Sequence, residues 1–417
     1  MKKRNPETEN IRSRAWLVVA AGFLMVFILY GSYYCFGVFL KPMLAELGWT
    51  RAMISGAFSL YMLVHGGFSM VMGSLSDRYG ARLIAAISAL VVAVGYGFVS
   101  ITTTPWHMYV GFGILVGIGM GAAYVTPIST VTRWFSEKRG LALGIVAAGV
   151  GVGQMVLPPI IKYLITLSGW RVSFVILGVM VFLIGIPAAL LLNSPTGRGS
   201  GIPRVESEKP EAEAHQRRSP HYDWTVREVL GTPGFWLLLL IFSALAFGVT
   251  IMAAHLVAHM EDIGIDSVPA AFALTLIGGG GIIGRIFFGR AGDRVGNRPM
   301  LTASMILQTL LMFFLIKSKQ VWAFYLISGL YGLSYGGALP VIISMSSQFY
   351  GVASAGAILG ILLFGATIGG AIGATLAGYI FDVTGGYALA FLAGGSVITS
   401  GTVISFLLRP PEKEHWR

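Results

Sequence analysis

Twelve long apolar blocks constrain this chain more than any other feature of its sequence. A helix needs about 20 mostly apolar residues to cross a hydrocarbon core of roughly 30 Å, and each block is about that long. The blocks lie at 15–39, 52–74, 82–103, 107–131, 140–165, 171–193, 234–259, 269–290, 299–317, 321–346, 355–381 and 386–408. Because lipid cannot satisfy an open backbone, each block is expected to be an α-helix. The sequence therefore predicts an all-α membrane protein with twelve transmembrane helices.

The composition excludes the main alternatives to a membrane protein. Only 11% of the 417 residues are charged and the mean hydropathy is +0.76, whereas soluble domains carry about a quarter charged residues. A soluble globular enzyme and a disordered chain are therefore excluded. The net charge of +11 could indicate a nucleic-acid partner. The basic residues fall between the apolar blocks, so the predicted partner is the lipid bilayer and no nucleic acid.

The polar segments divide the chain into five parts. We expect an N-terminal tail at 1–14, a six-helix bundle at 15–194, a connector at 195–232, a second bundle at 233–408 and a C-terminal tail at 409–417. A short surface helix is expected within the connector, near residues 224–230. No cleaved signal peptide is expected, because the N-terminus has no small-residue cleavage site before the first apolar block.

The distribution of basic residues predicts the orientation. With both termini inside, 22 of the 29 Lys and Arg residues fall on the inner side and six on the outer side. Such an excess of positive charge is typical of the cytoplasmic side of a membrane protein. The chain is therefore expected to be a multi-pass protein of the inner or plasma membrane with cytoplasmic termini.

An internal repeat relates the two bundles. Residues 73–82 and 289–298 both read G-x-x-x-D-R-x-G-x-R, at an offset of 216 residues. The same offset relates Trp106 to Trp322 and Gly149 to Gly365. Since six spans restore the original orientation, the two copies are parallel repeats. This is a transporter architecture that places the substrate site between the halves.

The repeated motif has two readings. As a gate, its acids could accept hydrogen bonds at a helix N-terminus, and its arginines could bind carboxylates or lipid phosphates. The alternative is a tight cytoplasmic turn that follows the positive-inside rule. The candidate gating residues are Gly73, Asp77, Arg78, Gly80 and Arg82 in the first copy, and Gly289, Asp293, Arg294, Gly296 and Arg298 in the second.

These features together resemble the major facilitator superfamily. A narrower resemblance is carried by the run W-F-S-E-K-R-G-L-A-L-G at 134–144, and by G-V-F-L-K at 37–41 followed by G-W-T-R at 48–51. Both runs are similar to monocarboxylate transporters and their bacterial oxalate/formate-antiporter relatives. Arg285, followed by Gly289, looks like their substrate-binding arginine. The resemblance implies the major facilitator fold and carriage of lactate, pyruvate or similar short carboxylates.

Arg285 is also the outlier of the sequence on physical grounds. It stands eight residues before Asp293 inside an apolar run, about 12 Å up from the inner loop. A charge at that depth costs at least about 2.5 kcal/mol, and arginine does not lose its proton. A transported anion would offset this cost through a two-point guanidinium–carboxylate pair. The alternatives are an arginine that snorkels to the surface or that pairs with a structural acid.

Polar and aromatic side chains deep in the spans are the remaining candidates for the substrate site. Deep tyrosines more often face a cavity or a neighbouring helix than lipid, and packing against a neighbour is the alternative for each. The candidates are Tyr33 and Tyr34 in the first span, Tyr124 in the fourth, Gln154 in the fifth, Tyr331 and Tyr335 in the tenth, and Phe364 in the eleventh.

The coupling ion is less well defined. His255 and His259 lie near the outer end of the seventh span, and either a wet outer rim or a proton-handling role for His255 fits that position. Animal monocarboxylate carriers have an aspartate one turn before the arginine, where this chain has Gly281, so proton symport and anion exchange both remain open. Symport of H+ with a monocarboxylate is the favoured function, by a monomer.

Other classes of function lack support in the sequence. An enzyme would need a nucleophile with its base, paired acids or a metal cluster. No paired carboxylates lie deep in the spans, and neither a metal nor a cofactor is expected. An anion channel is possible, although the six-plus-six duplication favours a carrier that works by alternating access.

Overall fold

The computed structural model describes residues 6–135, 139–193, 224–351 and 355–411. These residues form helices, turns and loops without a strand among them. The helices of the first half are α1 (Pro6–Tyr34), α2 (Phe36–Leu47), α3 (Arg51–Tyr79), α4 (Ala81–Ser100), α5 (Pro105–Met108), the π-helical η1 (Tyr109–Val116), α6 (Gly117–Met120), α7 (Val125–Trp134), α8 (Arg139–Met180), the π-helical η2 (Val181–Gly185) and α9 (Ile186–Leu191). Those that follow are α11 (Val226–Leu230), α12 (Pro233–Asp262), α13 (Ser267–Val295), α14 (Asn297–Lys317), α15 (Val321–Tyr350), α16 (Ala355–Thr384) and α17 (Ala388–Leu407).

The predicted number of spans is confirmed once the longest helix is divided. In the described residues, eleven helical segments are long and apolar enough to cross a membrane. One of them, Leu141–Leu191, has 51 residues, and at 1.5 Å per residue it would be about 76 Å long, more than twice the hydrocarbon core. Gly169 interrupts it with a φ of 77°, a left-handed conformation that only glycine adopts readily. The chain reverses there, so the segment holds two spans and the total is twelve.

Two spans deviate from single straight helices. The first continues past its expected end, because α1 passes at Cys35 into the apolar α2. The fourth consists of α5, η1, α6 and α7, with turns at 121–124. This span is rich in glycine, which weakens a helix interior. Its irregular backbone lies inside the protein rather than against lipid, because Gly119 and Gly121 meet α4 and α3 at close range.

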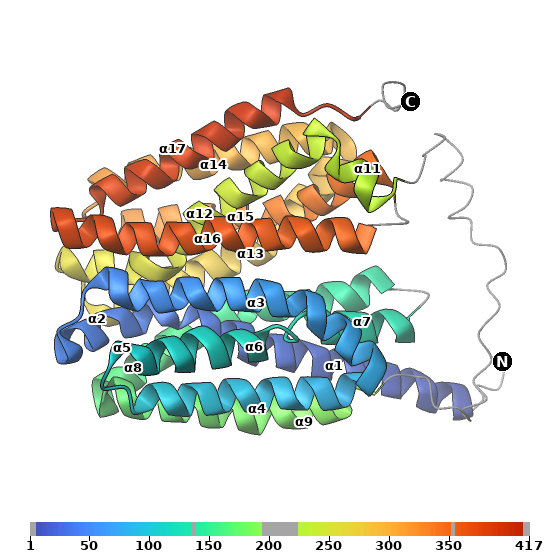
Figure 1. Cartoon of the computed structure of the whole chain (residues 1–417), viewed down its shortest axis with the longest axis horizontal. Helices are drawn as coiled ribbons and strands as arrows, with labels where there is room; N and C mark the ends of the chain where they lie inside the picture. The colour runs from blue at the N-terminus through green and yellow to red at the C-terminus, as the bar shows by residue number, and fades with distance from the viewer. Residues whose placement is uncertain (1–5, 136–138, 194–223, 352–354, 412–417) are drawn as a thin grey trace.

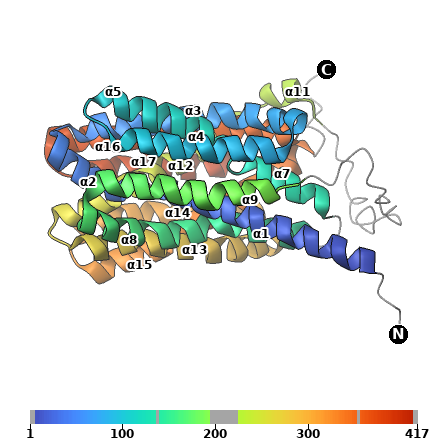
Figure 2. The same cartoon turned by 90° about the horizontal axis from the view of Figure 1, so that it is seen from below.

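The helices form two halves that lie side by side (Figure 1). Three helix pairs join the halves, namely α2 with α12, α3 with α16, and α8 with α13. The pairs α3–α16 and α8–α13 are related by the repeat, as expected for parallel six-helix units. The beginning of α1 and the end of α17 lie at the same end of the bundle (Figures 1 and 2). We call this the motif end, because the α3–α4 and α13–α14 turns lie there, and the opposite end the far end.

The expected surface helix is found as α11 at the motif end. Thr225 and Glu228 form a capping box at its start, so two backbone N–H groups that would otherwise lack a partner are satisfied. Trp224 is buried and donates its backbone N–H to the carbonyl oxygen of Tyr350. The rest of the predicted connector, up to residue 223, lies outside the described residues, as do the ends of both predicted tails.

Candidate substrate site and gates

Arg285 lies on α13 where this helix faces α8 of the other half. Its side chain is half-buried, and Nη1 donates to the carbonyl oxygen of Ala147 at 2.7 Å. Among the described residues, the ion pairs do not include Arg285. The guanidinium therefore does not pair with a structural acid among these residues. Most of its five donors remain available to a ligand.

Glycines allow α8 and α13 to approach closely beside Arg285. A Cβ built on Gly151 would lie 2.5 Å from Ile282, and one on Gly278 would lie 2.7 Å from the carbonyl oxygen of Gly151. Thr275 also donates its hydroxyl to the carbonyl of Met155 at 2.7 Å. Small residues of these two spans thus pack with backbone against backbone.

Three tyrosines lie near the guanidinium. Arg285 is close enough to Tyr30, Tyr34 and Tyr124 for direct electrostatic interaction with their hydroxyls. The rings of Tyr30 and Tyr124 are 5.9 Å apart in an edge contact. Tyr34 of α1 and Tyr335 of α15 lie close together across the two halves. A cation and several hydroxyl groups therefore converge between the halves, a combination that suits a carboxylate.

Tyr33 adjoins this group, with its ring 4.7 Å from that of Tyr34 and 6.5 Å from that of Tyr30. Tyr33 stacks on Phe58 and Tyr61, and its hydroxyl meets the sulfur of Met62 at 3.5 Å. The hydroxyl of Tyr331 points towards α12, since a Cβ on Gly248 would lie 3.1 Å from it.

Gln154 and Phe364 complete the set. Gln154 is buried on α8 against Gly278, which precedes Arg285 by two turns. Phe364 is half-buried on α16. None of the described contacts joins Phe364 to Arg285, so its place in the site stays a prediction. Tyr30 shares a helical face of the first span with Tyr33 and Tyr34, and it belongs to the group around Arg285.

The repeated motif forms the same turn twice. Gly80 lies between α3 and α4, and Gly296 lies at the equivalent position between α13 and α14. Their φ values are 94° and 103°. The side chains of Asp77 and Asp293 lie outside the described set, so the predicted gate remains a prediction. A Cβ built on Gly73 would lie 3.4 Å from Val125 of the same half. A Cβ built on Gly289 would have no described neighbour within 4 Å.

The arginines of the motif differ between the two copies. Arg298 donates to the carbonyl oxygens of Ser405, at 3.1 Å, and Phe406, and so caps the C-terminus of α17. Arg82 is exposed, and Arg78 lies over the ring of its neighbour Tyr79.

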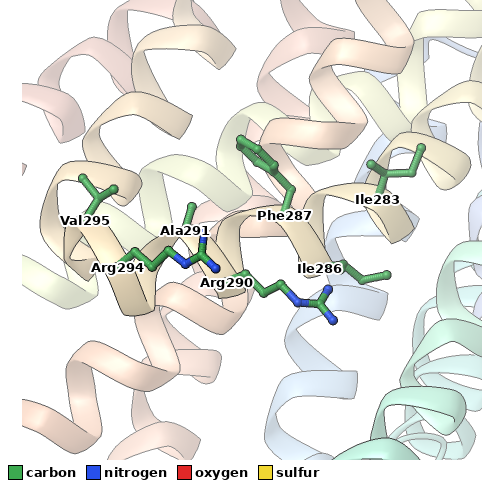
Figure 3. A pocket seen from close by; sticks show the side chains of 7 residues that line it. All are labelled: Ile283, Ile286, Phe287, Arg290, Ala291, Arg294 and Val295. Carbon is green, nitrogen blue, oxygen red and sulfur yellow. The ribbon is translucent and has the colours of Figure 1, made fainter.

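Arg294 lines a groove along one face of α13 (Figure 3). The groove has a volume of about 510 Å³. Its other lining residues are Ile283, Ile286, Phe287, Arg290, Ala291 and Val295. Arg290 is exposed and follows Arg285 by five residues, which turns it by about 140° around the helix axis. Arg290 is therefore not part of the group around Arg285.

His255 is fully buried rather than placed on a wet rim. Nδ1 lies 3.0 Å from the hydroxyl of Tyr387, and Nε2 lies 2.9 Å from the carbonyl oxygen of Ala374 and 3.3 Å from the hydroxyl of Ser55. Since Ser55 belongs to the first half, this histidine contributes to the contact between the halves. Its predicted proton-handling role is not tested by these contacts.

A network of charges closes the far end, and the sequence reasoning did not find it. Lys162 meets Glu261 at 2.6 Å, with both side chains buried. The carboxylate of Asp262 forms two ion pairs, one oxygen with Lys41 at 2.9 Å and the other with Arg51 at 2.8 Å. Every cation comes from the first half and every acid from the second.

The network continues at the start of α3. The backbone N–H groups of Arg51 and Ala52 donate to the two oxygens of the Asp382 carboxylate, at 2.9 and 2.7 Å. The guanidinium of Arg51 stacks on Phe381 and donates to the Tyr387 hydroxyl at 2.5 Å. We call Lys41, Arg51, Lys162, Glu261, Asp262 and Asp382 the far-end network.

The halves are closer at the far end than at the motif end. A Cβ on Gly37 would lie 2.5 Å from the carbonyl oxygen of Ala253, and one on Gly378 would lie 2.9 Å from the backbone of Arg51. At Gly144, Gly289 and Gly360, near the motif end, no described atom lies within 4 Å of such a Cβ. The two halves are therefore in contact at the far end, whereas the space beside these three glycines near the motif end is open.

Comparisons with known proteins agree with this architecture. The family model of the Major Facilitator Superfamily matches residues 22–290 and 244–417. Monocarboxylate transporter 13 of Bos taurus is 27% identical over 401 residues, covering 94% of this chain and 89% of that protein. The oxalate:formate antiporter of Oxalobacter formigenes is 24% identical over 356 residues, covering 84% and 81%.

Solved structures show the same fold. A bacterial homologue of the human lysosomal transporter Spinster, inward-facing and occupied, has a TM-score of 0.75 at 16% identity, with coverage of 96% of this chain and 98% of that one. Its inward-facing, unoccupied form has a TM-score of 0.73 at 15% identity. The fold, the repeat and the family match lead to one conclusion: the chain is a multi-pass membrane transporter of the major facilitator superfamily, similar to the monocarboxylate transporters.

Proposed function

We propose that the chain carries short monocarboxylates of the lactate or pyruvate type by proton symport and alternating access. The observation that carries this proposal is Arg285, a half-buried cation in a transmembrane helix that lies between the two halves and is satisfied on one nitrogen by a backbone carbonyl. A buried arginine without a carboxylate partner is costly in a membrane. A carboxylate ligand that accepts two of its remaining N–H groups would remove much of that cost.

The surroundings of Arg285 suit a small carboxylate. Hydroxyl groups of Tyr34, Tyr124 and Tyr335 can donate to carboxylate oxygens, and their ring faces can contact a short apolar tail. The glycines at the α8–α13 contact remove side-chain bulk on one side. Relatives named monocarboxylate transporters support this substrate class.

Alternating access would use the two ends of the seam between the halves. In this structure the far-end network is closed, while Gly144, Gly289 and Gly360 are free of contacts. We place the motif end in the cytoplasm of a cell with an inner or plasma membrane, because most basic residues lie at this end. A single chain contains both halves and is sufficient for this cycle.

Anion exchange of the oxalate/formate type is the second candidate. It is favoured by Gly281, which stands one turn before Arg285 and offers no proton-binding group, and by the similarity to the oxalate:formate antiporter. Proteoliposomes that are supplied with lactate from outside and hold no carboxylate inside separate the two mechanisms. A symporter acidifies the lumen when lactate is added outside, whereas an exchanger is silent until a counter-anion is supplied inside.

Substitution of Arg285 tests the site itself. Arg285→Gln is expected to lower saturable carboxylate uptake by at least tenfold, because the amide cannot supply the charge. Arg290→Gln on the same helix is the matched control and should retain uptake. Wild-type uptake by a folded Arg285→Gln protein would show that the transported anion is not bound there.

A further inference from the structure

The far-end network has a property that a simple closing contact does not require. Its positive charges, on Lys41, Arg51 and Lys162, all lie on the first half, and its carboxylates, on Glu261, Asp262 and Asp382, all lie on the second. When the far end opens, the halves must part between these groups. The first half then presents three cations at the mouth of the pathway with no acid from this network beside them.

These cations are arranged as carboxylate receptors. Lys41 and Arg51 take one oxygen each of the Asp262 carboxylate. The first two N–H groups of the 29-residue helix α3 take one oxygen each of Asp382, and unsatisfied N–H groups and the helix dipole favour an anion there. In both places two donors bind both oxygens of one carboxylate.

Lys162 forms a third receptor, with a single ammonium group on one carboxylate oxygen. Its ammonium group lies 2.6 Å from Glu261, and its side chain is 4% exposed. Two carboxylates from α12 and one from α16 thus occupy three positions at which a free carboxylate would find the same donors.

We propose that Lys41, Arg51, Lys162 and the N-terminus of α3 form a second anion site, which captures the transported carboxylate when the far end is open. The protein's own carboxylates displace this anion when the far end closes. The inference rests on the proposed carboxylate transport for the identity of the anion, but the binding site is defined by its own contacts. A cluster of like charges at the mouth of a cleft raises the local concentration of an anion and its rate of entry.

An anion site and a contact that only locks the halves predict different effects when the two members of one ion pair are substituted in turn. Both Lys162→Met and Glu261→Gln remove the same contact, so a lock alone requires them to behave alike. Capture requires opposite effects, because one substitution removes a ligand of the anion and the other removes its competitor. Lys41→Met and Asp262→Asn form a second such pair, should a Lys162 variant fail to fold.

The test is best made by equilibrium binding in the Arg285→Gln background, where the central site is disabled. We expect purified Arg285→Gln to bind lactate or oxalate weakly and saturably by calorimetry, with affinity that falls as ionic strength rises. Adding Glu261→Gln should tighten binding by about three- to tenfold, and adding Lys162→Met should weaken it at least as much. No saturable binding, or equal effects of the two substitutions, would overturn the proposal.

Transport measurements give an independent readout. In proteoliposomes that contain the protein with Arg285 intact, the Lys162→Met substitution should raise KM for anion supplied at the far end by about three- to tenfold. It should leave KM for anion supplied at the motif end unchanged. Glu261→Gln should not raise the far-end KM. If the wild type carried no carboxylate at all, the proposed function would fail, while the binding experiment would still decide the second site.

Discussion

Arg285 of α13 donates from Nη1 to the carbonyl oxygen of Ala147 on α8, 2.7 Å away, so a cation of one half is held by the backbone of the other. The two helices run antiparallel here, because Gly151 meets Gly278 further towards the far end. A ligand that engages the guanidinium would therefore act on the contact between the halves. Binding and movement would then be linked through one side chain.

The shape of this guanidinium leads to the first prediction. Arg285→Lys keeps the charge but loses the planar fork that matches a carboxylate at two points. We expect KM for the carboxylate to rise by about tenfold, with little change in thermal stability. Uptake assays over a range of substrate concentrations check this, and an unchanged KM would mean that charge alone suffices.

The α8–α13 contact provides a second prediction with a matched control. Gly278→Ala would place a methyl group 2.7 Å from the carbonyl oxygen of Gly151, whereas Gly279→Ala would meet the sulfur of Met155 at 3.8 Å, an ordinary contact. Overpacking of this kind costs about 1–3 kcal/mol. Uptake should fall by at least fivefold in Gly278→Ala and remain normal in Gly279→Ala. Equal activity of the two variants would contradict the close approach of the helices.

The turns of the repeated motif give a third prediction. Alanine at Gly80 or Gly296 would have to adopt a φ near 100°, which costs about 1–2 kcal/mol for a residue with a Cβ. Each substitution should lower the melting temperature in detergent. Gly97→Ala serves as the control, because its helical position in α4 is open and alanine favours a helix. A melting temperature for Gly80→Ala above that of the wild type would refute the strained turn.

A fourth prediction concerns the opposite state of the transport cycle. Beyond the contacts of Gly151 with Gly278 and of Ala147 with Arg285, Gly144 and Gly289 are the next glycines of α8 and α13 towards the motif end. These two glycines are free of contacts now and should approach when the motif end closes. A Gly144→Cys/Gly289→Cys pair in a Cys35→Ser background should form a disulfide that stops uptake reversibly.

The control for this experiment is each cysteine alone, which should transport normally in oxidant. Reductant should restore uptake by the double variant. Failure to cross-link under turnover conditions would indicate that the halves do not close between these two glycines.

Much of the fold was predictable because each span carries its own signal. A block of some 20 apolar residues indicates a membrane helix without reference to any other part of the chain. The repeat at an offset of 216 residues then fixed the relation of the halves. Gly169 was harder to interpret, since its role depends on a backbone conformation, although the blocks on either side of it were recognised as separate spans.

The site was predictable only in part, and the reason is physical. Arg285 stood out because a charge in an apolar run has no ordinary explanation, and the tyrosines near it were identified by depth. Depth alone did not show that Tyr33 also stacks on Tyr61 of α3, because that contact depends on how the helices pack.

The far-end network gave no such signal. Arg51 and Asp382 are 331 residues apart in the chain, and each resembles an ordinary charge at the end of a span. Their meeting depends on how the two halves are assembled. Local sequence patterns do not contain that information.

The glycine-lined seam affects how easily the halves can move. Where backbone meets backbone, as at Gly37, Gly151 and Gly378, no rotamers are frozen on contact and none are released on separation. Interdigitated side chains would have to change rotamer before the helices separate, whereas contacts between backbones need no such rearrangement. At these glycines the halves can therefore part without a large change in side-chain entropy, so the cost of opening the far end falls mainly on the charged groups there.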